Sequence, residues 1–287
     1  LRRWEFMRLP HESVADLENE EKVWELLKPW VTPEQATLIR FKLYNFKSLI
    51  SQKWRQNRVL IAGDAAHVMP PFMGQGMCAG FRDTLNLAWK ISGVLKGQYK
   101  DEILDSYFVE RSPHVNDVIE LSMFLGKVIC VPDPVEAQQR DQAFFDGVVP
   151  PPPSFPDLTQ GILASNPQFN PQQIAGKLSP HSNLQCGATQ KRLDDLIAGK
   201  FALLTLGQAP TASIPDLQVI SLLDEQSKDV QQLISQFMQQ HNIQAMLVRP
   251  DFYIFGAVEQ AEDAQQLVEY FENYMQKYHA VNTSAVA

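Results

Sequence analysis

The residue types best suited to chemistry lie in one short stretch. An apolar run at residues 59–62 leads into Gly63 and Asp64, and a proline-braced loop then reaches the glycine pair Gly74 and Gly76. This order predicts a buried strand, a loop and the first turn of a helix. A carboxylate at the end of a strand, followed by free backbone N–H groups at a helix N-terminus, can bind a polyhydroxylated and partly anionic ligand.

This stretch has two other interpretations. Asp64 is also suited to be the N-cap of a helical turn starting at Ala65, but the Pro-Pro pair and the Gly-x-Gly that follow favour ligand binding. The spacing Gly74-x-Gly76-x-x-x-Gly80 is one residue longer than the dinucleotide fingerprint, and a proline loop separates it from the strand. We therefore expect no pyrophosphate cradle here, and the chain contains no Gly-x-Gly-x-x-Gly.

The elements that must position this stretch begin upstream of it. Residues 1–9 and 41–46 predict strands, and residues 20–30 predict a helix by their apolar spacing. The run Thr32-Pro33-Glu34-Gln35 has the pattern of a capped helix start. These elements are too few for a closed fold of their own.

Two helical regions are expected downstream. Residues 76–95 predict a helix that ends at Gly97. Residues 101–129 predict one or two helices, interrupted or kinked at Pro113. The expected apolar stripes are Met77, Phe81, Leu85, Ala88 and Leu95 in the first region, and Ile103, Leu104, Tyr107, Phe108, Val115, Val118 and Leu121 in the second.

For four polar residues near these helices we prefer a structural role to a catalytic one. We expect Asp83 to bond with local backbone or a neighbouring arginine, and Glu110 and Arg111 to form an ion pair that fixes helix packing. His67 is expected to satisfy a backbone group, because no matched carboxylate is evident for catalysis.

Composition changes sharply after residue 130. Residues 131–179 hold about half of the 19 prolines and many amide side chains, which is typical of an extended connector. Regular patterns then return: strands at 201–206, 217–223, 245–248 and 252–257, and helices at 228–240 and 259–278. A helix, a hairpin and a final helix are the order of the C-terminal half of a thioredoxin-like fold, here without Cys-x-x-Cys and so without thiol–disulfide exchange.

Composition excludes several classes of function. The 287 residues carry a formal net charge of −8 and no basic stripe, which argues against nucleic acid as a partner. Three distant cysteines form neither a metal-ligand pair nor a disulfide scaffold, which fits a cytoplasmic location. We expect no membrane partner, because no apolar run is long enough to span a bilayer. The chain begins without methionine or a signal peptide, as though in the middle of a domain.

Residues 58–78 resemble the second flavin-binding motif of the FAD-dependent aromatic hydroxylases, the para-hydroxybenzoate hydroxylase family. The resemblance continues through Asp83 and the run Asn86-Leu-Ala-Trp89-Lys90. With the thioredoxin-like end, the chain is most similar to 3-(3-hydroxyphenyl)propionate hydroxylases. The resemblance implies an α/β fold: the C-terminal part of a Rossmann-like FAD-binding monooxygenase followed by a thioredoxin-like domain.

The resemblance also assigns residues to the cofactor. It implies that Asp64 accepts a hydrogen bond from a ribityl hydroxyl of FAD and that Pro71 lies beside the flavin ring. Gly74, Gln75, Gly76, Met77 and Cys78 would present backbone amides to the pyrimidine edge of the ring. Cys78 departs from the asparagine often found in the family, which puts one side-chain contact in doubt.

Aromatic residues upstream are candidates for the substrate. Because the family's substrate sheet precedes the Gly-Asp strand, Trp4, Tyr44 and Phe46 are expected to line the cavity. The implied domains are the end of the substrate-binding sheet region at 1–52 and the second half of the FAD-binding domain at 53–130. A connector at 131–179 and a thioredoxin-like domain at 180–287 follow.

The implied reaction belongs to aromatic catabolism. NADH or NADPH reduces FAD, and one atom of molecular oxygen is added ortho to the hydroxyl of a phenolic acid. Because no Gly-x-Gly-x-x-Gly unit is present, these 287 residues alone are expected to bind FAD weakly or not at all. The alternatives are a non-catalytic scaffold, in which the C-terminal region serves in dimerisation as a homodimer, and an FAD-dependent dehydrogenase or reductase.

Overall fold

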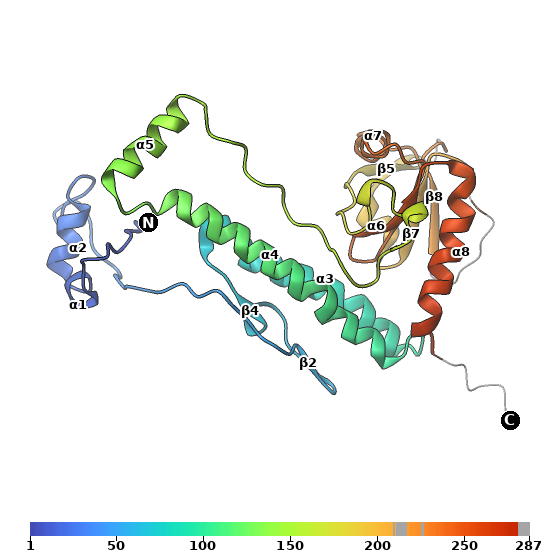
Figure 1. The fold of residues 1–287 in the computed structure, drawn as a ribbon, viewed down its shortest axis with the longest axis horizontal. Helices are drawn as coiled ribbons and strands as arrows, with labels where there is room; N and C mark the ends of the chain where they lie inside the picture. The colour runs from blue at the N-terminus through green and yellow to red at the C-terminus, as the bar shows by residue number, and fades with distance from the viewer. Residues whose placement is uncertain (209, 211–216, 225–226, 281–287) are drawn as a thin grey trace. The chain divides into compact units, whose positions relative to one another are not determined.

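The computed structural model describes residues 1–208, 210, 217–224 and 227–280 (Figure 1). The chain divides into two compact units. Unit 1 consists of Leu1–Leu49, Met69–Gly74 and Ile119–Ser154, and unit 2 of Ile50–Val68, Gln75–Val118 and Phe155–Ala287. In the part of the chain that is described, no helix is both long enough and apolar enough to cross a membrane.

Unit 1 is built from short capped helices. Ser13 forms a capping box at α1 (Val14–Leu17), and Asn19 caps α2 (Glu20–Leu27), which confirms the helix expected there. Asp133 caps α5 (Pro134–Phe145), whose first residue is a proline. The other elements of unit 1 are η2 (Pro71–Met73) and the second half of α4 (Asp105–Ile129).

Three expectations for unit 1 are wrong. Residues 1–9 and 41–46 are irregular, because no described strand pairs with them. Residues 33–35 form a turn rather than a helix, although the Gln35 side chain does accept a hydrogen bond from the Thr32 N–H at 3.1 Å. The cap forms but the helix does not extend, because Ile39 is exposed and no apolar face is buried to stabilise further turns.

Unit 2 begins with short strands. β2 (Arg55–Gln56) and β3 (Val59–Leu60) form an antiparallel hairpin, and β1 (Leu49–Ile50) pairs with β4 (His67–Val68), with η1 (Gly63–Ala65) before it. The buried strand predicted at residues 59–62 is wrong in both length and burial, since Val59 is 68% exposed. Among the described residues β2 is its one partner, so no second strand covers it.

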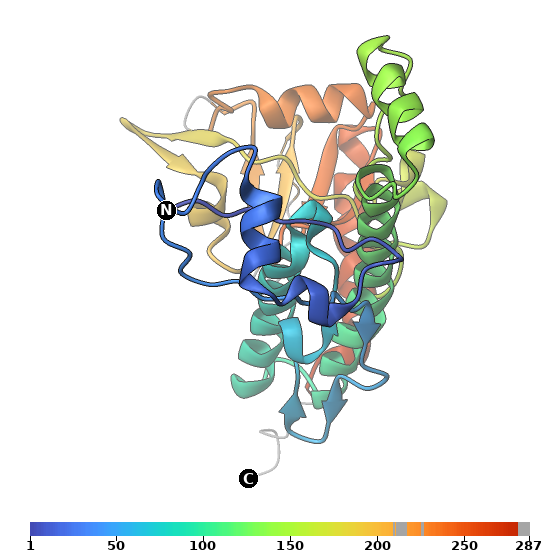
Figure 2. The same ribbon diagram turned by 90° about the vertical axis from the view of Figure 1, so that its left-hand side faces the viewer.

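Two long helices carry the polar part of unit 2. α3 (Gln75–Leu95) and the first half of α4 lie side by side, as Figure 1 and Figure 2 show, with η3 (Asp101–Leu104) between them in the chain. Gly97 ends α3 at φ +70°, as expected. Pro113 does not interrupt α4. Its missing N–H frees the carbonyl of Val109, which lies on the exposed side of the helix where water can satisfy it.

The two helices differ in how well their apolar spacing predicts burial. The residues expected to face inward from α4 and η3 are buried or half-buried, which confirms that stripe. The stripe expected for α3 is wrong, since Met77 is 70% exposed and Phe81 59% exposed, with Leu85 and Leu95 exposed as well. The face of α3 that is buried carries Ala79, Asp83, Asn86, Leu87, Trp89, Lys90 and Gly93.

The C-terminal part of unit 2 is a four-stranded sheet of order β10-β9-β7-β8. β7 (Phe201–Thr205) and β8 (Leu217–Ser221) are parallel, whereas β9 (Ala245–Val248) is antiparallel to β7 and to β10 (Ile254–Val258). These strands confirm the ones predicted. Before the sheet lie β5 (Asn183–Cys186), β6 (Thr189–Arg192) and α6 (Leu193–Ile197).

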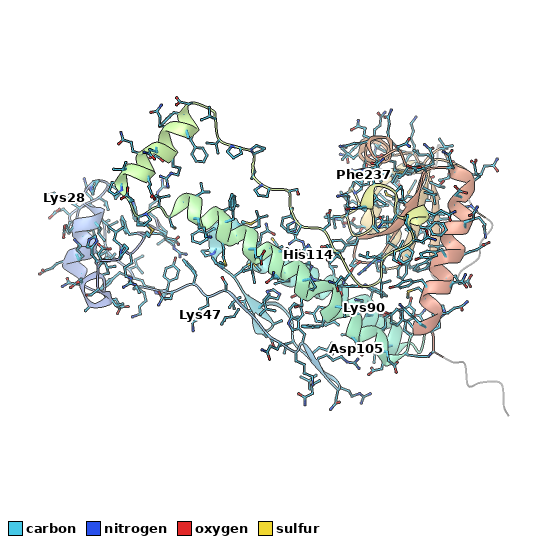
Figure 3. The ribbon with its side chains drawn as sticks, viewed as in Figure 1. Lys28, Lys47, Lys90, Asp105, His114 and Phe237 are labelled. Atoms are coloured by element: carbon cyan, nitrogen blue, oxygen red, sulfur yellow. The ribbon has the colours of Figure 1, made fainter. Side chains whose placement is uncertain are left out.

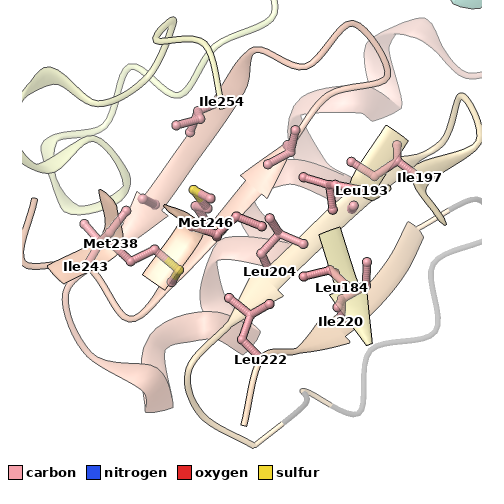
Figure 4. Close-up of a cluster of buried hydrophobic side chains, with 14 of the residues drawn as sticks. Leu184, Leu193, Ile197, Leu204, Ile220, Leu222, Met238, Ile243, Met246 and Ile254 are labelled. Carbon is pink, nitrogen blue, oxygen red and sulfur yellow. The ribbon is translucent and has the colours of Figure 1, made fainter. Parts of the chain in front are cut away.

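Helices cover both faces of this sheet. α8 (Ala264–Met275) packs its Phe271 against Phe201 and Phe255 on one face. α7 (Leu233–Gln240) contributes Met238 to an apolar cluster on the other face, which also contains Leu204 (Figure 4). Alternation along β7 explains the split, because neighbouring residues of a strand point to opposite faces. The two helices confirm those predicted, each with a later start.

The interval predicted as an extended connector is more ordered than its composition suggests. It contains α5, and in unit 2 it contains η4 (Pro167–Phe169) and η5 (Pro171–Gln173). Leu158, Ile162 and Ile174 are buried, and Gly176 donates its N–H to the Ile254 carbonyl at 2.9 Å. This part of the interval packs against the sheet, so the expectation of an extended connector is wrong here.

Candidate functional site

The Gly63–Asp64 turn packs directly on the backbone of α3. Gly63 has φ +56°, a conformation that glycine adopts without strain. A Cβ built on Gly80 would lie 3.5 Å from the Gly63 Cα, so both glycines allow the close approach of turn and helix. The Tyr107 hydroxyl donates to the Ile61 carbonyl at 3.2 Å and fixes the segment that enters the turn.

Asp83 anchors this turn from inside α3. One of its carboxylate oxygens, Oδ2, accepts the Gly63 N–H at 2.9 Å and contacts the His67 Nε2 at 2.7 Å. The other, Oδ1, accepts a hydrogen bond from the Arg111 Nε at 2.9 Å. The bond from Arg111 confirms the arginine expected for Asp83, whereas its backbone partner lies 20 residues away and is not local. Glu110 and Arg111 do not pair with each other: Arg111 pairs with Asp83 and Glu110 with Lys90, and both ion pairs join α4 to α3. The prediction for His67 is wrong, because its partner is a buried carboxylate rather than a backbone group.

Asp64 is presented outward by the same turn. Its side chain is exposed and makes no hydrogen bond to other described residues. The alternative role as an N-cap is wrong, because Asp64 lies inside η1 and the residue at the N-cap position is Ala62. Ala66 and His67, which follow, are buried. The Asp83 carboxylate of α3 therefore anchors the turn from inside, and the exposed Asp64 carboxylate is left free to bind a ligand.

The first turn of α3 contains Gln75, Gly76, Met77 and Cys78. A helix leaves the N–H groups of its first turn without intrahelical acceptors, so this end can donate to an anionic or carbonyl-bearing ligand. The Gln75 side chain is held by Arg82, whose Nη1 donates to Oε1 at 3.1 Å. Met77 is exposed, and Cys78 is half-buried with a free thiol.

The proline loop lies in unit 1. Pro71 is exposed and begins η2, and Gly74 ends it at φ +64° with open space where a Cβ would be. The Ser122 hydroxyl donates to the Pro70 carbonyl at 3.0 Å. A Cβ on Gly126 would lie 2.5 Å from the Phe72 ring, so this ring packs directly on α4. The loop is thus fixed at both ends of its proline pair.

Unit 1 brings together two of the three aromatic residues expected at the substrate. The rings of Tyr44 and Phe46 meet edge to face with centroids 4.7 Å apart, and Phe46 lies 6.2 Å from Phe72. The Tyr44 hydroxyl donates to the Glu5 Oε1 at 2.9 Å. Trp4 is half-exposed and has no ring contact with this pair among the described residues.

Sequence reasoning missed a second buried polar cluster in unit 2. The Glu110 carboxylate accepts hydrogen bonds from Lys90 Nζ at 2.8 Å and from Arg249 Nη2 at 2.7 Å. Asn86 donates to Glu110 at 2.6 Å and to the Asp251 Oδ2 at 2.8 Å, and Arg249 pairs with Asp251. A signal was available, since Asp83, Asn86 and Lys90 recur at helical spacing on one face of α3.

Burial and charge act against each other in this second cluster. Burial, together with Arg249, lowers the pKa of Lys90 to about 8, although Glu110 acts to raise it. Burial acts to raise the pKa of Glu110, but Arg249 and Lys90 outweigh it and hold that pKa well below its usual range. Each buried charge in the cluster is therefore stabilised by a partner of opposite charge, and removing one partner would leave the other buried and unpaired.

His114, which Figure 3 labels on α4, contacts the arginine that pairs with Asp83. Its Nδ1 contacts the Arg111 Nη1 at 2.7 Å and its Nε2 contacts the Pro156 carbonyl at 3.1 Å. Burial, together with the nearby Arg111, lowers the pKa of His114 to about 3. The imidazole is therefore neutral near pH 7, with Nδ1 as acceptor and Nε2–H as donor.

Residues 3–122 match the family described as FAD binding domain. The chain is 32% identical to "Probable NADH-specific resorcinol 4-hydroxylase" of Rhodococcus jostii (strain RHA1), over 89% of this chain and 50% of the relative. It is 30% identical to a 3-(3-hydroxy-phenyl)propionate/3-hydroxycinnamic acid hydroxylase of Klebsiella pneumoniae, over 92% and 54%. The chain thus spans about half the length of these relatives.

Solved structures with this fold include a complex of aklavinone-11 hydroxylase with FAD and aklavinone, with a TM-score of 0.66 at 22% identity over 93% of this chain and 52% of that one. The flavin-dependent monooxygenase PieE, in complex with FAD and substrate, also has a TM-score of 0.66, at 18% identity over 94% and 56%. At these identities the likeness concerns the fold. Residues 3–122 therefore match the FAD binding domain family, and the relatives to which the chain is similar are named as hydroxylases of aromatic compounds.

Proposed function

We propose that this chain binds the flavin end of FAD and serves in the hydroxylation of a phenolic aromatic acid ortho to its hydroxyl. NADH or NADPH would be the reductant and molecular oxygen the second substrate. The observation that carries the proposal is the Gly63–Asp64 turn, which is locked to α3 while the Asp64 carboxylate stays exposed and unpaired among the described residues. The match to an FAD binding domain supports the choice of ligand.

The arrangement of unit 2 fits a flavin. Asp64 offers an acceptor to a ribityl hydroxyl, and the first turn of α3 offers backbone donors and positive dipole to an electron-rich ring. The flavin supplies the redox and oxygen chemistry when it is bound. The cofactor-binding residues that we propose in unit 2 are Asp64, Gln75, Gly76, Met77 and Cys78, and the resemblance to the family adds Pro71 and Gly74.

The role of the protein would be to position the reactants and exclude water. Tyr44 and Phe46 offer apolar faces and a hydroxyl to an aromatic acid, and we propose them, with Trp4, as substrate residues. The relatives named as resorcinol 4-hydroxylase and 3-(3-hydroxy-phenyl)propionate hydroxylase support a small phenolic substrate. A homodimer in the cytoplasm is part of the same proposal.

We also propose that residues 180–287 form a thioredoxin-like domain, with boundaries at residues 52, 130 and 179 for the earlier parts. The strand order β8-β7-β9-β10, with one parallel and two antiparallel neighbours and helices on both faces, supports this assignment. The region has no Cys-x-x-Cys. Its role would therefore be docking rather than thiol exchange.

Titration with FAD, followed by quenching of flavin fluorescence, tests the proposal. We expect weak binding by the wild-type chain, and about a tenfold or greater loss for Asp64→Ala, since a hydrogen bond to a charged acceptor is removed. The matched control is Glu102→Ala, because Glu102 is an exposed carboxylate of the same unit. Equal loss in the two variants, or unchanged affinity in Asp64→Ala, would overturn the assignment of Asp64.

A further inference from the structure

The turn that presents Asp64 is closed at both ends by a single atom. The Oδ2 of Asp83 receives the Gly63 N–H, one residue before Asp64, and the His67 Nε2, three residues after it. Gly63 and His67 are drawn to the same point while Asp64 and Ala65 stay exposed. The Asp83 carboxylate therefore links the two ends of the Gly63–His67 turn.

The Asp83 carboxylate is itself held in place. Its Oδ1 accepts the Arg111 Nε at 2.9 Å, and both side chains are fully buried. Arg111 is fixed in turn by the His114 Nδ1 at 2.7 Å and by the Ala79 carbonyl at 3.4 Å. Arg111 thus sets the rotation of the Asp83 carboxylate and so directs Oδ2 at the turn.

A purely structural role for Asp83 would need less than this. Joining α3 to α4 requires only the Oδ1–Arg111 pair, which leaves the second oxygen free for any donor. Here the second oxygen makes two bonds, and both go to the segment that carries Asp64. Bonds from backbone and imidazole to an ionised carboxylate are charge-assisted, so they hold the left-handed Gly63 conformation firmly.

We infer that Asp83 is a positioning residue, which acts through the Gly63–His67 turn to hold the Asp64 carboxylate where a ribityl hydroxyl of FAD can reach it. This inference rests on the proposed function and deepens it. Asp83 touches no ligand itself. Its effect on flavin binding must therefore pass through Asp64, and that requirement can be tested.

The first test needs no flavin. In a chain labelled with ¹⁵N-glycine, the Gly63 amide should exchange slowly and resonate downfield, and Asp83→Asn should speed its exchange about tenfold or more. An asparagine cannot accept from Arg111 on one side and from both donors on the other, because its amide N–H₂ is itself a donor. Glu102→Gln is the control, since Glu102 is an exposed carboxylate of the same unit, and its loss should leave Gly63 exchange unchanged. Unchanged Gly63 exchange in Asp83→Asn would overturn the inference.

The second test is a double-mutant cycle on FAD affinity. Asp83→Asn should weaken binding about tenfold, whereas adding it to Asp64→Ala should cause no further loss. Losses that add in full would mean that Asp83 acts independently of Asp64 and would refute the positioning role. Should Asp83→Asn fail to fold, His67→Ala removes one of the two bonds and is expected to weaken binding by a smaller factor.

The two tests separate failure of the inference from failure of the proposed function. A wild-type chain that binds no FAD at any concentration would end the proposed function, and the Gly63 signals would then decide alone whether Asp83 holds the turn. A wild-type chain that binds FAD, with Asp83→Asn binding equally well, would leave the proposed function standing and remove the inference.

Discussion

Unit 2 contains two buried layers, one apolar and one charged. The layer on one face of the C-terminal sheet is apolar and contains Leu204, Met246 and Ile254. The layer between α3, α4 and the β9–β10 turn is charged, with Glu110 and Arg249 fully buried at its centre. The apolar layer tolerates changes that preserve volume, whereas the charged layer depends on every partner being present. Helix α3 belongs to the charged layer, and several of its apolar side chains, among them Met77, Phe81 and Leu95, face outward.

Breaking the charged layer should have the largest effect on stability. Arg249→Met leaves the Glu110 and Asp251 carboxylates buried without their guanidinium, and we expect the free energy of unfolding to fall by about 4 kcal/mol. Urea denaturation followed by circular dichroism measures this change. The control is Arg192→Met, which removes an exposed pair with Asp195 and should leave the free energy of unfolding nearly unchanged. A small change for Arg249→Met would mean that water reaches the cluster.

Truncation in the apolar layer comes next. Leu204→Ala removes a fully buried side chain from the centre of β7, and the free energy of unfolding should fall by about 3 kcal/mol through lost burial and the remaining cavity. Leu223→Ala is the matched control, because Leu223 is 66% exposed and its loss should change stability by less than about 0.5 kcal/mol. Equal costs at the two positions would contradict the placement of this core.

Acid should weaken the charged layer and spare the apolar one. The pKa of His114 is lowered from 6.5 to about 3, so the folded state disfavours its protonated form. Its contribution to stability is therefore full above pH 6.5 and is lost as the pH falls from 6.5 toward 3, amounting to about 2 kcal/mol at pH 5. The lowered pKa values of Glu110 and Asp83 add losses of the same sign at lower pH.

The variant His114→Gln isolates this effect. Glutamine keeps a donor and an acceptor but does not titrate, so the free energy of unfolding should change less between pH 7 and pH 5 than in the wild type. Denaturation curves at both pH values give the comparison. An identical pH dependence in the variant and the wild type would assign the acid sensitivity to other groups.

The outward face of α3 should give the smallest effect. Phe81→Gln replaces a ring that is 59% exposed, and stability should change by less than about 0.5 kcal/mol. Trp89→Ala, on the buried face of the same helix, should cost about 3 kcal/mol or more. A large loss for Phe81→Gln would show that this face is covered in solution.

The contrast between the layers explains what the sequence could predict. Apolar periodicity finds the sheet and the helices α7 and α8, because those elements bury apolar side chains. The same rule fails for α3, where Asp83, Asn86 and Lys90 share the buried face with apolar residues. It also fails for residues 1–9 and 41–46, since a strand exists only where a partner strand accepts its hydrogen bonds.

The candidate site shows the same limit. The residue types and order at Gly63, Asp64 and Gly76 predict a ligand-binding turn before a helix, and the structure has that turn and that helix. The sequence predicts an arginine partner for Asp83 but does not identify it, because Arg111 lies 28 residues from Asp83 in the chain. Arg249 lies 139 residues from Glu110. Such bonds follow from tertiary packing, which no local pattern encodes.

The most direct test of the flavin assignment is a titration of the ¹⁵N-glycine-labelled chain with FAD, followed residue by residue. The chain has 14 glycines, and those near the proposed site in unit 2 are Gly63, Gly76 and Gly80. We predict that these three amides shift progressively even when binding is weak, while Gly187 and Gly199 in the C-terminal region do not move. Shifts confined to the C-terminal glycines, or no shift at any glycine, would contradict the claim that this turn binds flavin.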